Sequence, residues 1–97
     1  DSWRRRDLLE SAAELGSVPA KAELGYMYLY GVGVKRNTSR GLTYLDTAIK
    51  RKYGPAEYQL GLYHFQKALD WLYRASNHGN EEAQAYLEKL MKFRIIH

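Results

Sequence analysis

Apolar residues recur along most of the chain at the three- and four-residue spacing of an amphipathic α-helix. No stretch keeps the two-residue alternation that is typical of a β-strand. The spacing predicts six helical segments: one capped by Asp1 and Ser2, then Pro19–Tyr30, Ser39–Lys52, Pro55–Phe65, Gln66–His78 and Glu81 to about Lys92. We therefore expect an all-α fold.

One pattern occurs three times along the chain. Each copy has an alanine, a second alanine eight residues later and a leucine twelve residues later, the leucines being Leu24, Leu60 and Leu87. Gly25 and Gly61 follow the first two leucines, at helix positions where glycine is disfavoured by about 1 kcal/mol relative to alanine. A glycine at such a position indicates that another backbone passes too close for a side chain. The sequence therefore predicts a repeat protein built from tightly packed helical hairpins.

The second copy is shorter than the first. Ala48 follows Ala12 after 36 residues, but Ala75 follows Ala48 after only 27 residues, which is nine fewer. The missing block corresponds to Tyr30–Thr38, the loop of the first copy that contains Gly31 and Gly33. The turn between the two helices of the second hairpin is thus absent from the sequence.

Two accounts of the missing turn remain open. The stretch from Tyr63 to Ala68 contains no glycine or proline, so the two helices could fuse into one that pairs with a second molecule by swapping. Alternatively, a flexible loop of the natural chain is missing between Phe65 and Gln66. We predict the missing loop, with the Cα atoms of Phe65 and Gln66 farther apart than the 3.8 Å of a trans peptide.

These patterns together resemble the Sel-1-like repeat, a relative of the tetratricopeptide repeat. The resemblance rests on LGYMYLYGVGV at 24–34, GLTYLDTA at 41–48 and KALDWLYRA at 67–75, and it covers about Ser11–Leu90. Gly41 departs from the family's usual alanine, and Lys52 stands where the other copies have glycine. The resemblance implies a right-handed α-solenoid of antiparallel helix pairs whose concave face binds other proteins. Because the chain begins with Asp1, we expect one repeat domain, 1–97, from a longer array.

Candidate partner-binding residues are those expected to face outward from the first helix of each pair. Their register is taken from Leu24 and Tyr28, which should be buried. The positions selected in this way are Ala22, Tyr26, Leu29, Tyr30, Tyr58, Leu62, Phe65, Lys89 and Lys92. An aromatic row that ends in lysines suits a protein partner, which could be acidic, because tyrosine supplies contact area at low entropic cost. The other interpretation is that several of these residues contact the next repeat.

The composition and the absence of certain motifs argue against several classes of function. The 15 basic and 11 acidic residues give a net charge of +4, but the basic runs fall on separate segments and no nucleic-acid-binding module is present. With no cysteine and no histidine pair at helical spacing, we expect no metal site and no cofactor. No apolar run approaches the 18 residues of a membrane span, so we expect no membrane insertion; no signal peptide is visible either, and the compartment stays open.

The remaining function classes are ordered by their support. The sequence favours a scaffold that binds a protein partner. The alternative is a dedicated inhibitor, such as an immunity protein that occludes a toxin enzyme, a role that the family resemblance also implies. A hydrolase comes third, because no catalytic motif is present and no cysteine could act as a nucleophile. We therefore expect no enzymatic activity.

Overall fold

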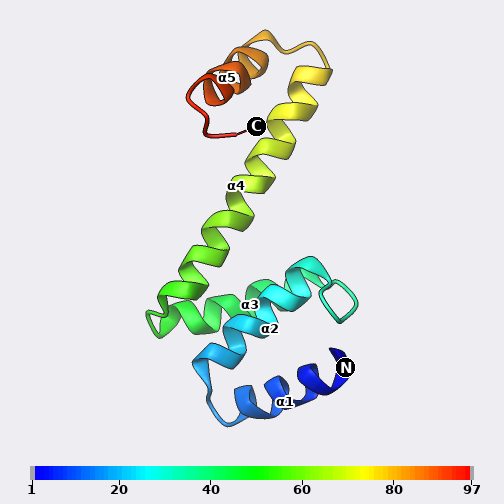
Figure 1. Ribbon diagram of the computed structural model, residues 1–97, viewed down its shortest axis with the longest axis vertical. Helices are drawn as coiled ribbons and strands as arrows, with labels where there is room; N and C mark the ends of the chain where they lie inside the picture. Colours follow the sequence, from blue (N-terminus) through cyan, green and yellow to red (C-terminus); the bar gives the residue numbers. More distant parts are fainter. Residues whose placement is uncertain (1, 97) are drawn as a thin grey trace. The chain divides into compact units, whose positions relative to one another are not determined.

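The computed structural model describes residues 2–96, and their regular secondary structure is entirely α-helical. The helices are α1 (Ser2–Glu14), α2 (Val18–Tyr30), α3 (Thr38–Lys50), α4 (Gly54–Asn77) and α5 (Glu81–Lys92) (Figure 1). The expected all-α fold is thereby confirmed, whereas the cap predicted at Asp1 lies outside the described residues. The chain divides into two compact units, residues 1–61 and 62–97, which are described separately below.

Local side-chain chemistry sets the ends of several helices. The side chains of Ser17, Asn37 and Asn80 each accept a hydrogen bond from the backbone N–H three residues later, at 3.3, 3.0 and 2.7 Å. These bonds satisfy N–H groups that the first turn of a helix leaves without a partner. Pro19 lies in the first turn of α2, and Gly31 ends that helix with a φ of 68°. Such local signals are visible in the sequence, and α2 and α5 accordingly begin within one residue of their predicted starts.

Helix α4 corrects two predictions. The segments expected at Pro55–Phe65 and Gln66–His78 form a single helix of 24 residues, so the predicted break between Phe65 and Gln66 is wrong. The physical reason is local: no residue between Tyr63 and Ala68 disfavours helical torsions or removes a backbone donor. The first complete repeat has a glycine loop at this point, whereas the second has an uninterrupted helix.

Helix α3 also ends earlier than expected, at Lys50 rather than Lys52. Lys52 adopts a φ of 58°, in the left-handed region that glycine occupies most readily. Gly16 and Gly79 stand at the matching positions of the other copies, with φ values of 97° and 88°. The turn after the second helix of a repeat therefore keeps its left-handed residue even where a lysine replaces the glycine.

Helices α2 and α3 cross at two glycines. A Cβ atom added to Gly25 would lie 2.7 Å from Cγ of Leu45 and 3.0 Å from the carbonyl oxygen of Gly41. A Cβ atom added to Gly41 would lie 2.9 Å from the carbonyl oxygen of Gly25 and 2.9 Å from the backbone nitrogen of Leu29. The close helix contact predicted for Gly25 is confirmed. The same contact accounts for glycine rather than alanine at position 41.

The core of the first unit joins α1 to the α2–α3 hairpin. Its buried members are Ala13, Ala20, Leu24, Met27 and Tyr28, and the partly buried side chains of Leu9, Ala12, Val34 and Tyr44 pack against them. Apolar residues from three helices and the glycine loop thus share one cluster. The second alanine of each repeat copy is also buried, at Ala20, Ala56 and Ala83.

A polar group lies at the edge of this core. The hydroxyl of Tyr28 donates a hydrogen bond of 2.9 Å to Oε1 of Glu10, which also pairs with Arg40 at 3.4 Å. The Arg40 guanidinium lies over the Tyr28 ring, 4.8 Å from its centroid, and Tyr44 stacks on the same ring at 6.0 Å. Burial raises the pKa of Tyr28, and the Glu10 carboxylate raises it further. The group therefore ties α1, α2 and α3 together.

We expect Tyr28→Phe to lower the free energy of unfolding by about 1 kcal/mol at neutral pH, the usual net value of one hydrogen bond. The raised pKa of Tyr28 in the folded state also makes this contribution pH-dependent. It is fully present below the ordinary pKa of 10.0 and is lost as the pH rises through the folded-state value. Urea unfolding of both proteins at a series of pH values tests this. A stability difference that stays constant above pH 10 would contradict it.

A candidate protein-binding surface

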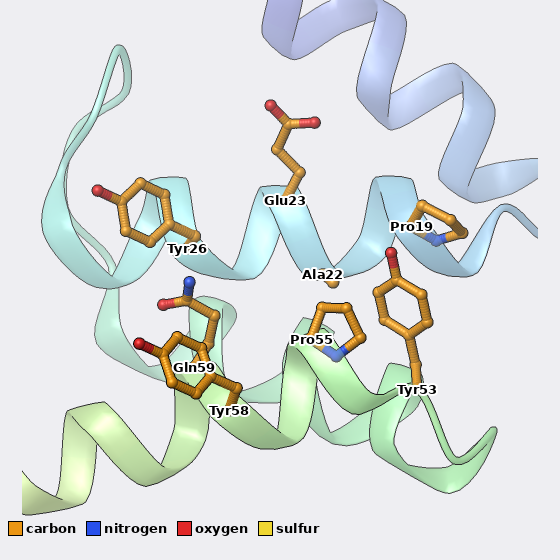
Figure 2. A pocket seen from close by; sticks show the side chains of 8 residues that line it. All are labelled: Pro19, Ala22, Glu23, Tyr26, Tyr53, Pro55, Tyr58 and Gln59. Atoms are coloured by element: carbon orange, nitrogen blue, oxygen red, sulfur yellow. The ribbon is translucent and has the colours of Figure 1, made fainter.

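An open hollow lies between α2 and the start of α4, entirely within the first unit. Its volume is about 330 Å³. Figure 2 shows the lining side chains, which come from α2 on one side and from Tyr53 and the start of α4 on the other. They are Pro19, Ala22, Glu23, Tyr26, Tyr53, Pro55, Tyr58 and Gln59. The hollow is therefore formed by the first helices of two successive repeats.

Tyrosine side chains provide most of the aromatic surface in this region. Tyr58 is 65% exposed and Tyr26 is 40% exposed, although both line the hollow. Tyr30, one turn beyond Tyr26 on α2, places its ring centroid 5.1 Å from that of Tyr26. Three aromatic rings with polar hydroxyl groups thus lie on the same side of the first unit. Such rings can bury apolar area and still form hydrogen bonds at their tips.

A second hollow of about 320 Å³ adjoins the first and shares Glu23 and Tyr26 with it. Val32 and Gly33 of the glycine loop form part of its lining. Glu23 is paired with Arg5 of α1, so its carboxylate does not face the hollows as an isolated negative charge. The two hollows form one continuous surface that runs from the start of α4 across α2 to the loop. We call this the tyrosine surface and define its aromatic residues as Tyr26, Tyr30 and Tyr58.

Two residues expected to face outward are buried instead. Leu29 is 0% exposed, and it packs against Gly41 at the crossing of α2 and α3. It lies four residues after Gly25 and therefore shares the face of α2 that contacts α3. Ala22 is 7% exposed and forms part of the floor of the first hollow. The outward orientation predicted for Leu29 and Ala22 is wrong.

The other predicted binding residues belong to the second unit. Leu62 and Phe65 are exposed on α4, at 39% and 41%, and Lys89 and Lys92 are exposed on α5. Phe65 lines a separate hollow of the second unit, between α4 and α5. The structure thus brings Tyr26, Tyr30 and Tyr58 together with Ala22. The residues of the predicted row from tyrosines to lysines belong to two separate units, so they do not form one described surface.

Sequence reasoning missed five residues of the first hollow: Pro19, Glu23, Tyr53, Pro55 and Gln59. Glu23 lies beside Ala22 on α2, and Gln59 lies beside Tyr58, so a wider stripe on each helix would have included both. Tyr53 precedes α4, where helical periodicity gives no information about direction. Its place could be found only from the path of the chain between α3 and α4.

Helical segments that repeat with matched glycines and buried alanines define this chain as an α-helical repeat protein. The sequence profile of a family described as Sel1 repeat matches residues 6–17, 18–53, 54–66 and 65–80. The chain therefore belongs to the Sel1 repeat family, whose helical repeats are generally scaffolds for protein interaction. The matches at 54–66 and 65–80 meet inside α4, where the first complete repeat has its loop. No match was found among curated proteins or among solved structures.

Two kinds of feature are absent from the residues that the structure describes. None of their helices has the length and apolar character needed to cross a membrane. No group of three or more histidine, cysteine, aspartate or glutamate side chains is placed among them to hold a metal ion.

Proposed function

We propose that this chain binds a protein partner through the tyrosine surface. The observation that supports the proposal is that exposed tyrosines from two successive repeats line one hollow, with Tyr26 on α2 and Tyr58 on α4. Aromatic residues at the centre of a surface contribute a large share of the binding energy in many protein complexes. Sel1 repeats are generally scaffolds for protein interaction, and Tyr26 and Tyr58 lie on the first helices of two successive repeats.

The chemistry of the tyrosine surface indicates what kind of partner segment would bind there. Ala22 and Pro55 provide an apolar floor, and Glu23, Gln59 and the tyrosine hydroxyls provide polar groups at its margin. A partner segment with a few apolar side chains and flanking hydrogen-bonding groups would match this arrangement. The proposed partner is acidic, because the chain carries a net charge of +4. Charged contacts of this kind would make the association rate fall as salt is added.

We expect the combined variant Tyr26→Ala and Tyr58→Ala to bind its partner at least about tenfold more weakly, because truncating an interface hot spot typically costs about 2 kcal/mol or more. The partner is first captured from the native source with a photo-crosslinking amino acid at position 58. The dissociation constant is then measured for the wild type and the variant, with circular dichroism to verify the helical content.

Tyr73→Ala is the matched control, because Tyr73 is an exposed tyrosine of the second unit and lies outside both hollows of the tyrosine surface. It should leave the dissociation constant unchanged. An unaltered constant in the double variant would show that binding uses another face. A single partner enzyme captured in stoichiometric amount, and inhibited by the chain, would assign the interaction to a dedicated inhibitor rather than to an adaptor.

A further inference from the structure

Helix α4 contains, one after the other, the sequence counterparts of both helices of the α2–α3 hairpin. Residues of α2 match the first half of α4 after a shift of 36 positions, so Gly25 corresponds to Gly61. Residues of α3 match the second half of α4 after a shift of 27 positions, so Leu45 corresponds to Leu72. In the α2–α3 hairpin these two faces pack on each other. Within α4 they follow one another along the same helix axis and cannot pack together.

The matching positions differ in how well they are covered. Leu45 is 0% exposed, whereas Leu72 is only partly buried. A Cβ atom added to Gly25 would meet Leu45 at 2.7 Å, but one added to Gly61 would meet no atom within 4 Å. The glycine that permits a close helix contact is therefore kept in α4, but nothing occupies the space in front of it.

The uncovered second half of α4 forms part of an apolar groove in the second unit. The groove has a volume of about 760 Å³, and α4 and α5 both contribute to its lining. Its lining includes Leu69 and Leu72 from α4 and Tyr86 and Leu90 from α5, and it contains no charged residue. A second helix with apolar and small residues on one face would suit this groove.

We propose that a second copy of the chain fills this groove with the first half of its own α4, and that the contact is reciprocal. The chain itself contains the segment that covers the equivalent face in the complete repeat, namely the residues that match α2. Each copy offers one such segment and one such groove. The exchange closes with two-fold symmetry and leaves no further groove open. Tyr58 of the tyrosine surface lies on this same half of α4, three residues before Gly61, whereas Tyr26 lies on α2.

The crossing of α2 and α3 fixes the register of the dimer. Transferred to α4, it places Gly61 of one copy against Leu72 of the other, and Phe65 of one copy against Ala68 of the other. Both pairs have their midpoint between positions 66 and 67. Two antiparallel α4 helices can therefore make both contacts twice around a two-fold axis near Gln66.

The first test is the molecular mass in solution. Light scattering and sedimentation on the purified chain at micromolar concentrations should give twice its mass of 11.3 kDa. Gly61→Leu should weaken the dimer about tenfold or more, because overpacking a close helix contact is strongly unfavourable. Within a single chain the same change only raises helix propensity, so helical content should be kept or increased. Asp70→Leu, on the opposite face of α4, should leave the dimer intact.

Cysteine crosslinking tests the register, since the natural sequence contains no cysteine. Ala68→Cys places a thiol near the proposed axis, where its copy lies close enough for a disulfide, which needs Cα atoms within about 7 Å. Mild oxidation should therefore produce a covalent dimer. In Asn77→Cys the two thiols would lie roughly 30 Å apart, calculated at about 1.5 Å per residue, and should not crosslink within the dimer.

A monomer at all concentrations tested would overturn the proposal. So would a dimer that Gly61→Leu does not weaken, because the proposed contact requires a glycine at position 61. Equal crosslinking at Ala68→Cys and Asn77→Cys would indicate association without a defined register and would equally overturn it. Binding at the tyrosine surface is tested separately by Tyr26→Ala, which leaves α4 unchanged.

Discussion

Gly25→Leu is expected to separate α2 from α3 and to lower the free energy of unfolding by about 3 kcal/mol, at the upper end of typical overpacking effects. The first carbon of the new side chain would already lie 2.7 and 2.8 Å from two carbon atoms of Leu45. Leu45 is 0% exposed, so other atoms enclose it and it cannot move aside into solvent. The carbonyl oxygen of Gly41, at 3.0 Å, is part of the backbone and can move only with α3.

Urea unfolding followed by circular dichroism measures this loss of stability. Asp46→Leu is the matched control, because it adds the same side chain to an exposed position of α3 and removes only a surface ion pair with Lys50. Its effect should stay within about 0.5 kcal/mol. If Gly25→Leu unfolded at the same urea concentration as the wild type, the close crossing of α2 and α3 would not matter for stability.

The helices themselves could be predicted because their signals are local. Ser17 and Asn37 cap their helices through their own side chains, and Gly31 ends α2 through its left-handed torsions. The close approach at Gly25 could also be predicted, since a glycine inside an apolar helix face usually marks a place where another backbone passes. The sequence signals for these features are local, so the features could be predicted without knowledge of the tertiary structure.

The continuity of α4 was predicted wrongly because two indications conflicted. The absence of a turn signal between Tyr63 and Ala68 favoured one helix, whereas the apolar side chains of Leu69 and Leu72 favoured a hairpin that would bury them. The local indication determined the structure, and the two leucines remain only partly buried. A conflict of this kind between local and tertiary preferences marks a site where a further partner can be sought.

The candidate site could be predicted in part. Tyr26 and Tyr58 followed from the repeat register, because each is exposed on the first helix of its repeat. Leu29 was misplaced because the outward face was measured from Leu24 and Tyr28 alone, without the Gly25 contact. Tyr53 could not be found at all, since it lies outside a helix and reaches the hollow only through the fold of the chain.

Restoring the missing turn should convert α4 into a hairpin. The nine residues of Tyr30–Thr38, inserted between Phe65 and Gln66, would supply the left-handed glycines and the cap that end α2 and start α3. The two halves of α4 could then pack within one chain and bury Leu69 and Leu72, each worth up to roughly 1.5–3 kcal/mol. Closing a loop of this length costs about 2 kcal/mol. We therefore expect a monomer that is more stable than the natural chain by about 2 kcal/mol, because buried leucines together outweigh loop closure.

The control insertion has nine residues that favour helix, such as alanine, glutamate and lysine. It lengthens α4 without a turn and should leave Leu69 and Leu72 as exposed as before, so it should bring no gain in stability. Urea unfolding and light scattering distinguish the two insertions, and hydrogen exchange locates the new protection in residues 66–77. Equal stability of the two insertions would mean that the two faces of α4 are not complementary. In that case the matched glycines and leucines of α2, α3 and α4 would share a sequence pattern without sharing a packing arrangement.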